Sequence, residues 1–338
     1  MAKVLVTGGT GFVGGHIILQ LIDAGHEVRT TIRNLSRAAE VSGVVATHGR
    51  NTGALEVVQA DLLADHVWND ACKGVEYVLH VASPFPAEEP DDPQELIVPA
   101  REGALRVLRA ARNASVKRVV MTSSFAAVGY GIPAREEAFD EKDWTDPDHP
   151  SVQAYMQSKT HAEKAAWDFI EREGQGLELS VINPTGIFGP VLGADYSTSI
   201  GLIQALLQGA LPAVPRIAFG VVDVRDVADL HLRAMTTAAA NGERFIAVSG
   251  KALWLKDVAA ILRANLGERA ALVPTAEMPD SEVIQMAKIA PAMAAMVPQL
   301  GIIRETTSRK AQSLLGWQPR SVEDAIIASA ESLLNLAS

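Results

Sequence analysis

Short runs of aliphatic and β-branched residues alternate, over the first two-thirds of the chain, with longer segments whose apolar residues recur every three to four positions. The short runs predict strands, and the longer periodic segments predict helices. The clearest helices are expected at residues 12–24, 93–113 and 155–172. Strands are expected at residues 3–7, 27–32, 55–60, 76–82, 117–123 and 178–183. This alternation is typical of an α/β fold with a doubly wound parallel sheet.

The predicted division into domains is not a single cut. A further strand-and-helix unit at 219–235 and a strand at 245–248 are expected to extend the core. Residues 1–185 with about 218–248 would form the larger domain, and residues 186–217 with 249–338 a smaller, mostly C-terminal lobe. The proline- and acid-rich stretch 83–93 follows the end of a strand, where parallel sheets bind ligands, so we expect it to flank the mouth of a site.

Glycines lie at regular intervals between the first predicted strand and the first predicted helix. A bound dinucleotide needs a tight turn there, close approach of the backbone to its pyrophosphate, and a helix N-terminus whose free N–H groups face the negative charge. An ordinary strand-to-helix turn can also be rich in glycine. The position of the motif at the start of a strand–helix–strand pattern favours the dinucleotide. The expected contacts are Gly8, Thr10, Gly11, Phe12, Val13 and Gly14.

The second predicted strand is followed by Arg33 and not by the acid that would hold the ribose 2′-hydroxyl of NAD. A guanidinium can bind the 2′-phosphate of NADP with two N–H groups, and Arg37 follows one turn later. A solvated charge at a strand end is the alternative interpretation of Arg33. After the third strand, Asp61 and Leu62 suit contacts with adenine, although Asp61 could instead cap the next helix.

Tyr155 and Lys159 are four residues apart in a predicted helix, so their side chains share one face. Because an ammonium favours a nearby phenolate, we expect Lys159 to lower the pKa of Tyr155 from its usual value of about 10. The same ammonium can bond a nicotinamide ribose while the phenol exchanges a proton with the substrate. Ser124 is expected to orient the substrate oxygen, with Ser123 as the alternative. Hydroxyls that only finish the strand would give the same pattern.

Composition excludes several classes of function. The chain has 338 residues, 48% of them hydrophobic, so it can bury a substantial core, and no apolar run is long enough for a membrane helix. A net charge of −10 disfavours nucleic acids and anionic membranes as partners. The single cysteine, Cys72, excludes an internal disulfide and a cysteine-cluster metal site, and we expect no metal. Because the glycine turn begins too early for a signal-peptide hydrophobic region, we expect a cytoplasmic protein.

Seven sequence features together resemble the dihydroflavonol 4-reductase-like group of extended short-chain dehydrogenases, which includes plant flavonoid reductases and microbial aldehyde and ketone reductases. They are VTGGTGFVG (6–14), Arg33, HVASP (80–84), TSS (122–124), YMQSKTHAEKAAWDF (155–169), NPTGIFGP (183–190) and LGWQPRSVEDAI (315–326). The resemblance covers nearly the whole chain. It implies a seven-stranded Rossmann core, bound NADP(H), and catalytic positions at Ser124, Tyr155 and Lys159. Further cofactor contacts are expected at Val81, Ala82, Ser83, Thr122, Tyr155, Lys159 and Pro184.

We therefore expect an NADP(H)-dependent reductase that reversibly converts small aldehydes or ketones to alcohols, as a monomer or homodimer. A hydroxysteroid dehydrogenase, a nucleotide-sugar epimerase or dehydratase, and a non-catalytic NADP(H) sensor remain alternatives. In flavonoid reductases an asparagine five positions after the catalytic serine touches the flavonoid. Gly129 stands at that position here, so a flavonoid substrate is not expected. Residues 130–149 and 186–215 are expected to form the substrate pocket.

Overall fold

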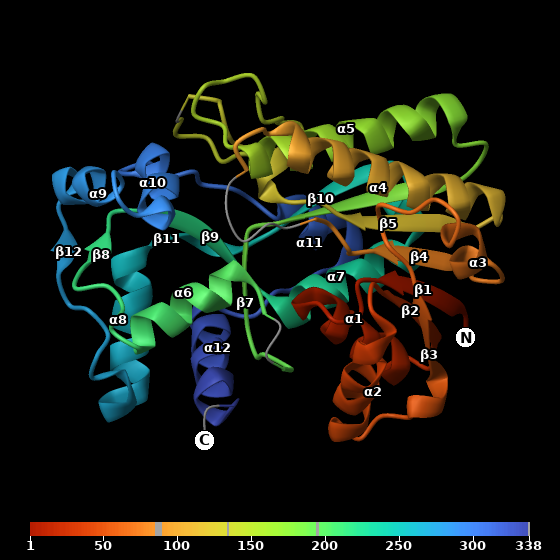
Figure 1. Cartoon of the computed structure of the whole chain (residues 1–338), viewed down its shortest axis with the longest axis horizontal. Helices are drawn as coiled ribbons and strands as arrows, with labels where there is room; N and C mark the ends of the chain where they lie inside the picture. The colour runs from red at the N-terminus through yellow and green to blue at the C-terminus, as the bar shows by residue number, and fades with distance from the viewer. Residues whose placement is uncertain (85–89, 134, 194–195, 337–338) are drawn as a thin grey trace.

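The computed structural model describes residues 1–84, 90–133, 135–193 and 196–336. Its centre is a parallel sheet in the order β10-β6-β5-β4-β1-β2-β3 (Figure 1). Because the strand order runs outward in both directions from β1 and β4, these two strands flank the point at which doubly wound sheets bind ligands. The predicted fold class is confirmed. The strands are β1 (Lys3–Thr7), β2 (Glu27–Ile32), β3 (Leu55–Gln59), β4 (Tyr77–His80), β5 (Arg118–Thr122), β6 (Glu178–Pro184) and β10 (Glu243–Ala247).

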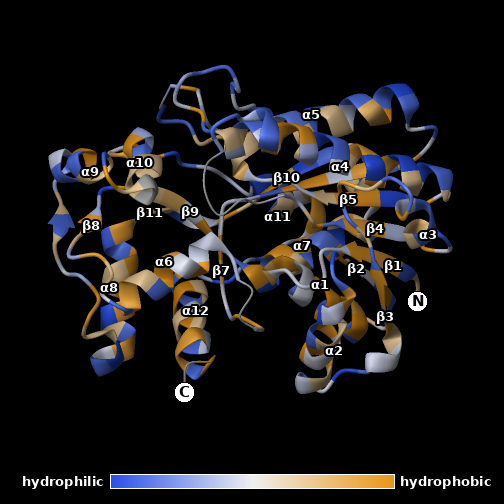
Figure 2. Cartoon of the chain, viewed as in Figure 1, coloured by the Kyte–Doolittle hydropathy of each residue, from blue (hydrophilic) through white to orange (hydrophobic). Residues whose placement is uncertain are grey.

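Helices cover both faces of this sheet (Figure 1). One face carries α1 (Phe12–Asp23), α2 (Ala38–Thr47), α7 (Val224–Thr236) and α11 (Arg309–Leu315), which share a buried core with the strands. The other carries α3 (Trp68–Cys72), α4 (Gln94–Asn113) and α5 (Ala154–Glu173), with a second core. Strands covered on both faces are expected to be hydrophobic on both, and Figure 2 shows much of this sheet in orange.

A smaller lobe lies beside the main sheet (Figure 1). It contains a three-stranded sheet of β11 (Ser249–Trp254), β9 (Ala218–Asp223) and β7 (Gly186–Phe188), and the short pair β12 (Glu277–Met278) and β8 (Val214–Pro215). Around them pack α6 (Thr198–Leu207), α8 (Leu255–Leu266) and α12 (Val322–Leu336). Two short helices, α9 (Asp280–Met286) and α10 (Pro291–Met296), complete the lobe. No helix among the described residues combines the length and apolarity needed to cross a membrane.

The structure corrects the predicted boundary between core and lobe in two places. The unit predicted at 219–235 is split, because β9 joins the three-stranded sheet while α7 packs against the main sheet. Within the segment predicted as lobe, α11 and Trp317 pack into the core of the main sheet, where the Trp317 indole donates to the carbonyl of Asp226 over 2.9 Å. An apolar strand pattern predicts a strand but does not specify which sheet it joins.

Candidate active site

The turn after β1 has the crowded backbone that a bound pyrophosphate requires. Gly8 has a φ of +78°, and a Cβ at Gly14 would lie 2.3 Å from the carbonyl oxygen of Gly8. The helix α1 begins after Gly11 with no side-chain cap and no acidic residue in its first turn, so its N–H groups are open to an anion. The predicted glycine motif therefore fits a dinucleotide phosphate on the geometry of the backbone.

Thr7, which the sequence did not single out, connects the glycine turn to the end of β4 by hydrogen bonds. The Thr7 hydroxyl accepts hydrogen bonds from the backbone N–H groups of Val81 and Ala82, over 3.0 and 2.9 Å. It also lies 3.0 Å from Nδ1 of His80. These bonds fix the segment after β4 beside the glycine turn, on the other side of the point where the strand order reverses. Residues 85–89 of the stretch expected to flank the site lie outside the described residues.

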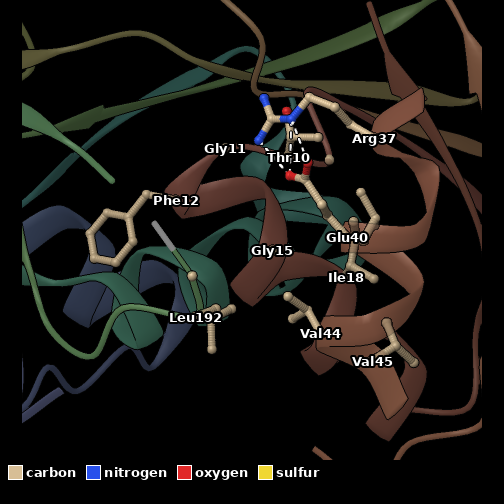
Figure 3. Close-up of a pocket in the computed structure, with 13 residues that line it drawn as sticks. Thr10, Gly11, Phe12, Gly15, Ile18, Arg37, Glu40, Val44, Val45 and Leu192 are labelled. Atoms are coloured by element: carbon tan, nitrogen blue, oxygen red, sulfur yellow. Dashed lines mark hydrogen bonds and ion pairs between the residues drawn. The ribbon is translucent and has the colours of Figure 1, made fainter. Parts of the chain in front are cut away.

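A pocket of about 650 Å³ opens beside the glycine turn, between α1 and α2 (Figure 3). Its polar end holds Thr10 and Arg37, and the Arg37 guanidinium forms an ion pair with Glu40 over 2.7 Å. That hydrogen bond from Arg37 lowers the pKa of Glu40. Arg33 is exposed at the end of β2, where its carbonyl accepts from the side chain of Gln59. Both arginines are among the residues expected from the sequence, whereas Glu40 is not.

Asp61 makes a local bond at the end of β3. Its carboxylate accepts from the N–H of Leu63 over 2.9 Å, while α3 begins only at Trp68. The suggestion that Asp61 caps the next helix is therefore wrong, because the bond closes a turn before that helix. The carbonyl of the neighbouring Leu62 accepts from Arg106 over 2.9 Å. Contact of either residue with adenine stays a prediction.

Ser124, Tyr155 and Lys159, here called the catalytic group, lie close together near the carboxyl ends of β5 and β6. Ser124 follows β5, and its hydroxyl accepts from the N–H of Ala126 over 3.1 Å and bonds the Tyr155 phenol. Tyr155 lies in the first turn of α5, half-buried, and Lys159 follows one turn later with 7% of its surface exposed. The Lys159 ammonium nitrogen is 5.9 Å from the centre of the Tyr155 ring. The structure thus brings together the three residues that the sequence separated.

The pKa values depart from the sequence-based expectation at Tyr155. Burial raises the pKa of Tyr155, and the hydrogen bond from Ser124 only partly opposes that rise. The prediction that the pKa of Tyr155 lies below its usual value is wrong in this structure, because desolvation of the phenolate outweighs the only opposing influence, the hydrogen bond with Ser124. Burial also lowers the pKa of Lys159 to about 8, against the attraction of Glu163, and lowers that of His80 to about 3.

A buried hydrogen-bonded network lies behind this catalytic group. The Glu163 carboxylate, which is 0% exposed, accepts from Ser123 over 2.5 Å, from Asn183 over 2.7 Å and from Arg244 over 2.5 Å. The Asn183 amide also donates to the carbonyl of Ser124 over 3.2 Å. Arg244 in turn lies 3.7 Å from the centre of the Trp144 ring. This network holds the backbone of Ser124 in place.

Two of the candidate hydroxyls are engaged away from Tyr155. Ser123 donates to Glu163, which makes the alternative choice of Ser123 for orienting substrate incompatible with this arrangement. The Thr122 hydroxyl lies 2.7 Å from Nε2 of His231, on α7. Pro184 ends β6, paired with Ala247 of β10 at the same edge of the sheet. Cofactor contacts at Thr122 and Pro184 stay predictions.

The family is decided by a match over most of the chain. Residues 4–247 match the NAD dependent epimerase/dehydratase family. The chain belongs to this family. Among the described residues of this member, no group of three His, Cys, Asp or Glu side chains is arranged to hold a metal ion.

Several proteins to which this chain is similar are reductases. The NADPH-dependent methylglyoxal reductase of Saccharomyces cerevisiae is 30% identical over 354 residues, which cover 98% of this chain and 98% of the relative. Tetraketide alpha-pyrone reductase 2 of Arabidopsis thaliana is 35% identical over 260 residues, covering 75% and 80% of the two chains. The crystal structure of yeast methylglyoxal/isovaleraldehyde reductase Gre2 complexed with NADPH aligns over 99% of both chains, with a TM-score of 0.82 and 28% identity. The resemblance to extended short-chain reductases is confirmed.

Proposed function

We propose that this chain is an NADPH-dependent reductase that converts small aldehydes or ketones to alcohols, reversibly. The observation that carries the proposal is the convergence of Ser124, Tyr155 and Lys159 beside a glycine turn that fits a dinucleotide phosphate. The NADPH-dependent methylglyoxal reductase of yeast, similar over nearly the whole chain, supports the choice of reaction and of cofactor. Arg33, which follows β2, and Arg37, which precedes α2, would hold the 2′-phosphate of NADPH.

The residues of the site divide the chemistry among them. NADPH, when bound, supplies the hydride that reaches the carbonyl carbon. Ser124 would donate a hydrogen bond to the carbonyl oxygen and so orient it, and Tyr155 would give that oxygen a proton as negative charge develops. A raised pKa keeps the Tyr155 phenol protonated at neutral pH, ready for this role. Lys159, charged below a pKa of about 8, would bond the nicotinamide ribose.

The test is a steady-state assay of the purified protein. We expect loss of NADPH absorbance with methylglyoxal, isovaleraldehyde or other small aldehydes and ketones, and a lower kcat/KM with NADH. Hydroxysteroids and a nucleotide sugar belong in the same panel, because turnover of these alone would favour the alternative functions. Tight NADPH binding without turnover of any carbonyl compound would contradict the reductase and indicate a sensor.

A further inference from the structure

The segment that follows the catalytic serine leads directly to a second aromatic residue beside Tyr155. Tyr130 packs with Tyr155 against the buried side chains of Val152 and Met156. Its ring meets that of Phe125, the residue after Ser124, at 5.8 Å between centres and an angle of 64°. The backbone N–H of Tyr130 donates to the Thr145 hydroxyl over 3.0 Å, which fixes the backbone that carries the ring. Tyr130 is therefore packed next to Tyr155, the proposed proton donor.

Arg304, from the C-terminal part of the chain, packs against the Tyr130 ring. The Arg304 guanidinium carbon lies 4.7 Å from the centre of the Tyr130 ring. Its Nε donates to the carbonyl of Gly129 over 2.9 Å, and its Nη1 donates to the side-chain oxygen of Gln299 over 2.8 Å. A Cβ at Gly129 would lie 2.4 Å from the Phe125 ring, so this position has no room for a side chain of its own. Arg304 thus places a positive charge against Tyr130, which itself packs in the same cluster as Tyr155.

The partners of Arg304 differ from those of three other arginines whose side chains are partly or fully buried. Arg118, Arg225 and Arg244 each bond a carboxylate, over 2.5 to 2.6 Å. The two acceptors bonded to Arg304 within the described chain are a backbone carbonyl and an amide, both neutral. Burial lowers the pKa of Arg304, opposed only by Tyr130, although a guanidinium stays charged at any working pH. This desolvated charge has no anion to balance it among the described residues.

The guanidinium also keeps hydrogen-bonding capacity. An arginine has five N–H donors. Two of them make the bonds to Gly129 and Gln299, which leaves three without an acceptor in the described part of the chain. The free donors are one on Nη1 and both on Nη2. One N–H from each of two nitrogens is the pair that matches the two oxygens of a carboxylate. The contact with the Tyr130 ring and the two hydrogen bonds hold the guanidinium in place.

We propose that Arg304 binds an anionic group of the substrate, so that the preferred substrates are aldehydes or ketones that carry a carboxylate. The reacting carbonyl would meet Ser124 and Tyr155 while the carboxylate, on the far side of the Tyr130 ring, pairs with Arg304. This rests on the proposed reductase function and adds the class of substrate to it. The uncharged ester of such a substrate would lose the ion pair and keep the same reacting carbonyl.

The experiment compares 4-carboxybenzaldehyde with its methyl ester, in the wild type and in Arg304→Met. Methionine keeps an unbranched stem over Tyr130 and removes the charge. In the wild type we expect the acid to have a kcat/KM at least about tenfold above that of the ester, the size of one charge-assisted interaction. Arg304→Met should abolish this preference, mainly by raising KM for the acid, and leave the ester nearly unchanged. Arg304→Lys should retain part of the preference, because it keeps the charge without the planar fork.

Arg309→Met is the matched control, since Arg309 is exposed and close by in sequence. It should keep the wild-type preference. NADPH binding and thermal unfolding check that each variant is folded. Equal kcat/KM values for acid and ester in the wild type, or a preference that survives in Arg304→Met, would overturn the proposal for Arg304. If the wild type reduces neither aldehyde but does reduce methylglyoxal or isovaleraldehyde, the reductase function stands, and only turnover of no carbonyl compound at all refutes it. In both cases calorimetry with benzoate decides on Arg304. Binding that is lost in Arg304→Met supports the anion site, and no binding to the wild type rules it out.

Discussion

The two ion pairs that flank the proposed site differ in what surrounds them. Glu163 and Arg244 are 0% and 7% exposed, and the carboxylate is also bonded by Ser123. Arg37 and Glu40, beside the glycine turn, are 37% and 58% exposed and stand three positions apart at the start of α2. A buried pair cannot exchange its partner for water, whereas an exposed pair is screened and readily replaced. The first arrangement suits a fixed catalytic geometry, and the second suits an edge that must admit a charged cofactor.

The largest effect on activity is expected in the catalytic group, for Tyr155→Phe. Phenylalanine keeps the ring and its packing against Val152 and Met156 but removes the proton donor. Turnover in the reduction should fall by about 10²–10⁴, the usual contribution of a positioned general acid. NADPH binding and the unfolding midpoint should stay near the wild-type values. Near-normal turnover would remove Tyr155 from the mechanism and leave it as a structural residue of α5.

The next prediction tests the buried pair through Glu163→Gln. The change leaves the Arg244 charge buried opposite a neutral amide, which we expect to cost about 3 kcal/mol in the free energy of unfolding. Urea unfolding of the variant, monitored by fluorescence, gives this value. Glu40→Gln is the control at the exposed pair and should shift stability by no more than about 0.5 kcal/mol. Similar losses in the two variants would mean that burial does not distinguish these regions.

The pH dependence of the reduction should report Lys159. Its pKa of about 8 is below the usual value for lysine, so the ammonium is present at neutral pH and is lost as the pH rises through about 8. We expect kcat/KM for the carbonyl substrate to be level below this pH and to fall above it. The raised pKa of Tyr155 keeps the phenol protonated over the same range, so the fall is not due to the tyrosine.

Lys159→Met provides the control for that profile. It should have low activity at every pH and weaker NADPH binding, without the inflection near the pKa of Lys159. The free energy of unfolding should change with pH in the opposite direction to the activity. Burial makes the Lys159 ammonium unfavourable in the folded state, so the wild type should gain stability as the pH rises from about 8 toward the ordinary lysine pKa. An unchanged affinity for NADPH in Lys159→Met would contradict the proposed bond to the ribose.

The smallest effect on activity is expected at the proposed 2′-phosphate site, for Arg33→Ala. Removing one of the two arginines proposed to hold the 2′-phosphate should raise KM for NADPH by up to about tenfold and leave KM for NADH nearly unchanged. Initial rates at varied concentrations of each cofactor measure the two constants. A wild-type enzyme that already uses NADH better than NADPH would contradict the assignment of Arg33.

The sequence alone determined the elements and the local chemistry of this protein. Hydrophobic periodicity located the strands of the main sheet and the helix that carries Tyr155 and Lys159, because such patterns depend only on neighbouring residues. The glycine turn was equally local, since its crowding arises within a few residues. Residues at strand ends, such as Ser124, could be chosen because parallel strands bring their carboxyl ends to one edge.

Only the tertiary structure decided which distant residues complete the site. Glu163 and Arg244 are 81 positions apart, and Arg304 reaches the carbonyl of Gly129 across 175 positions, so neither contact leaves a periodic or spaced signal in the chain. The direction of the pKa shift at Tyr155 likewise depends on how deeply packing buries the phenol. The sheet that β9 joins was undetermined for the same reason, because strand pairing is a choice among partners far away in the sequence.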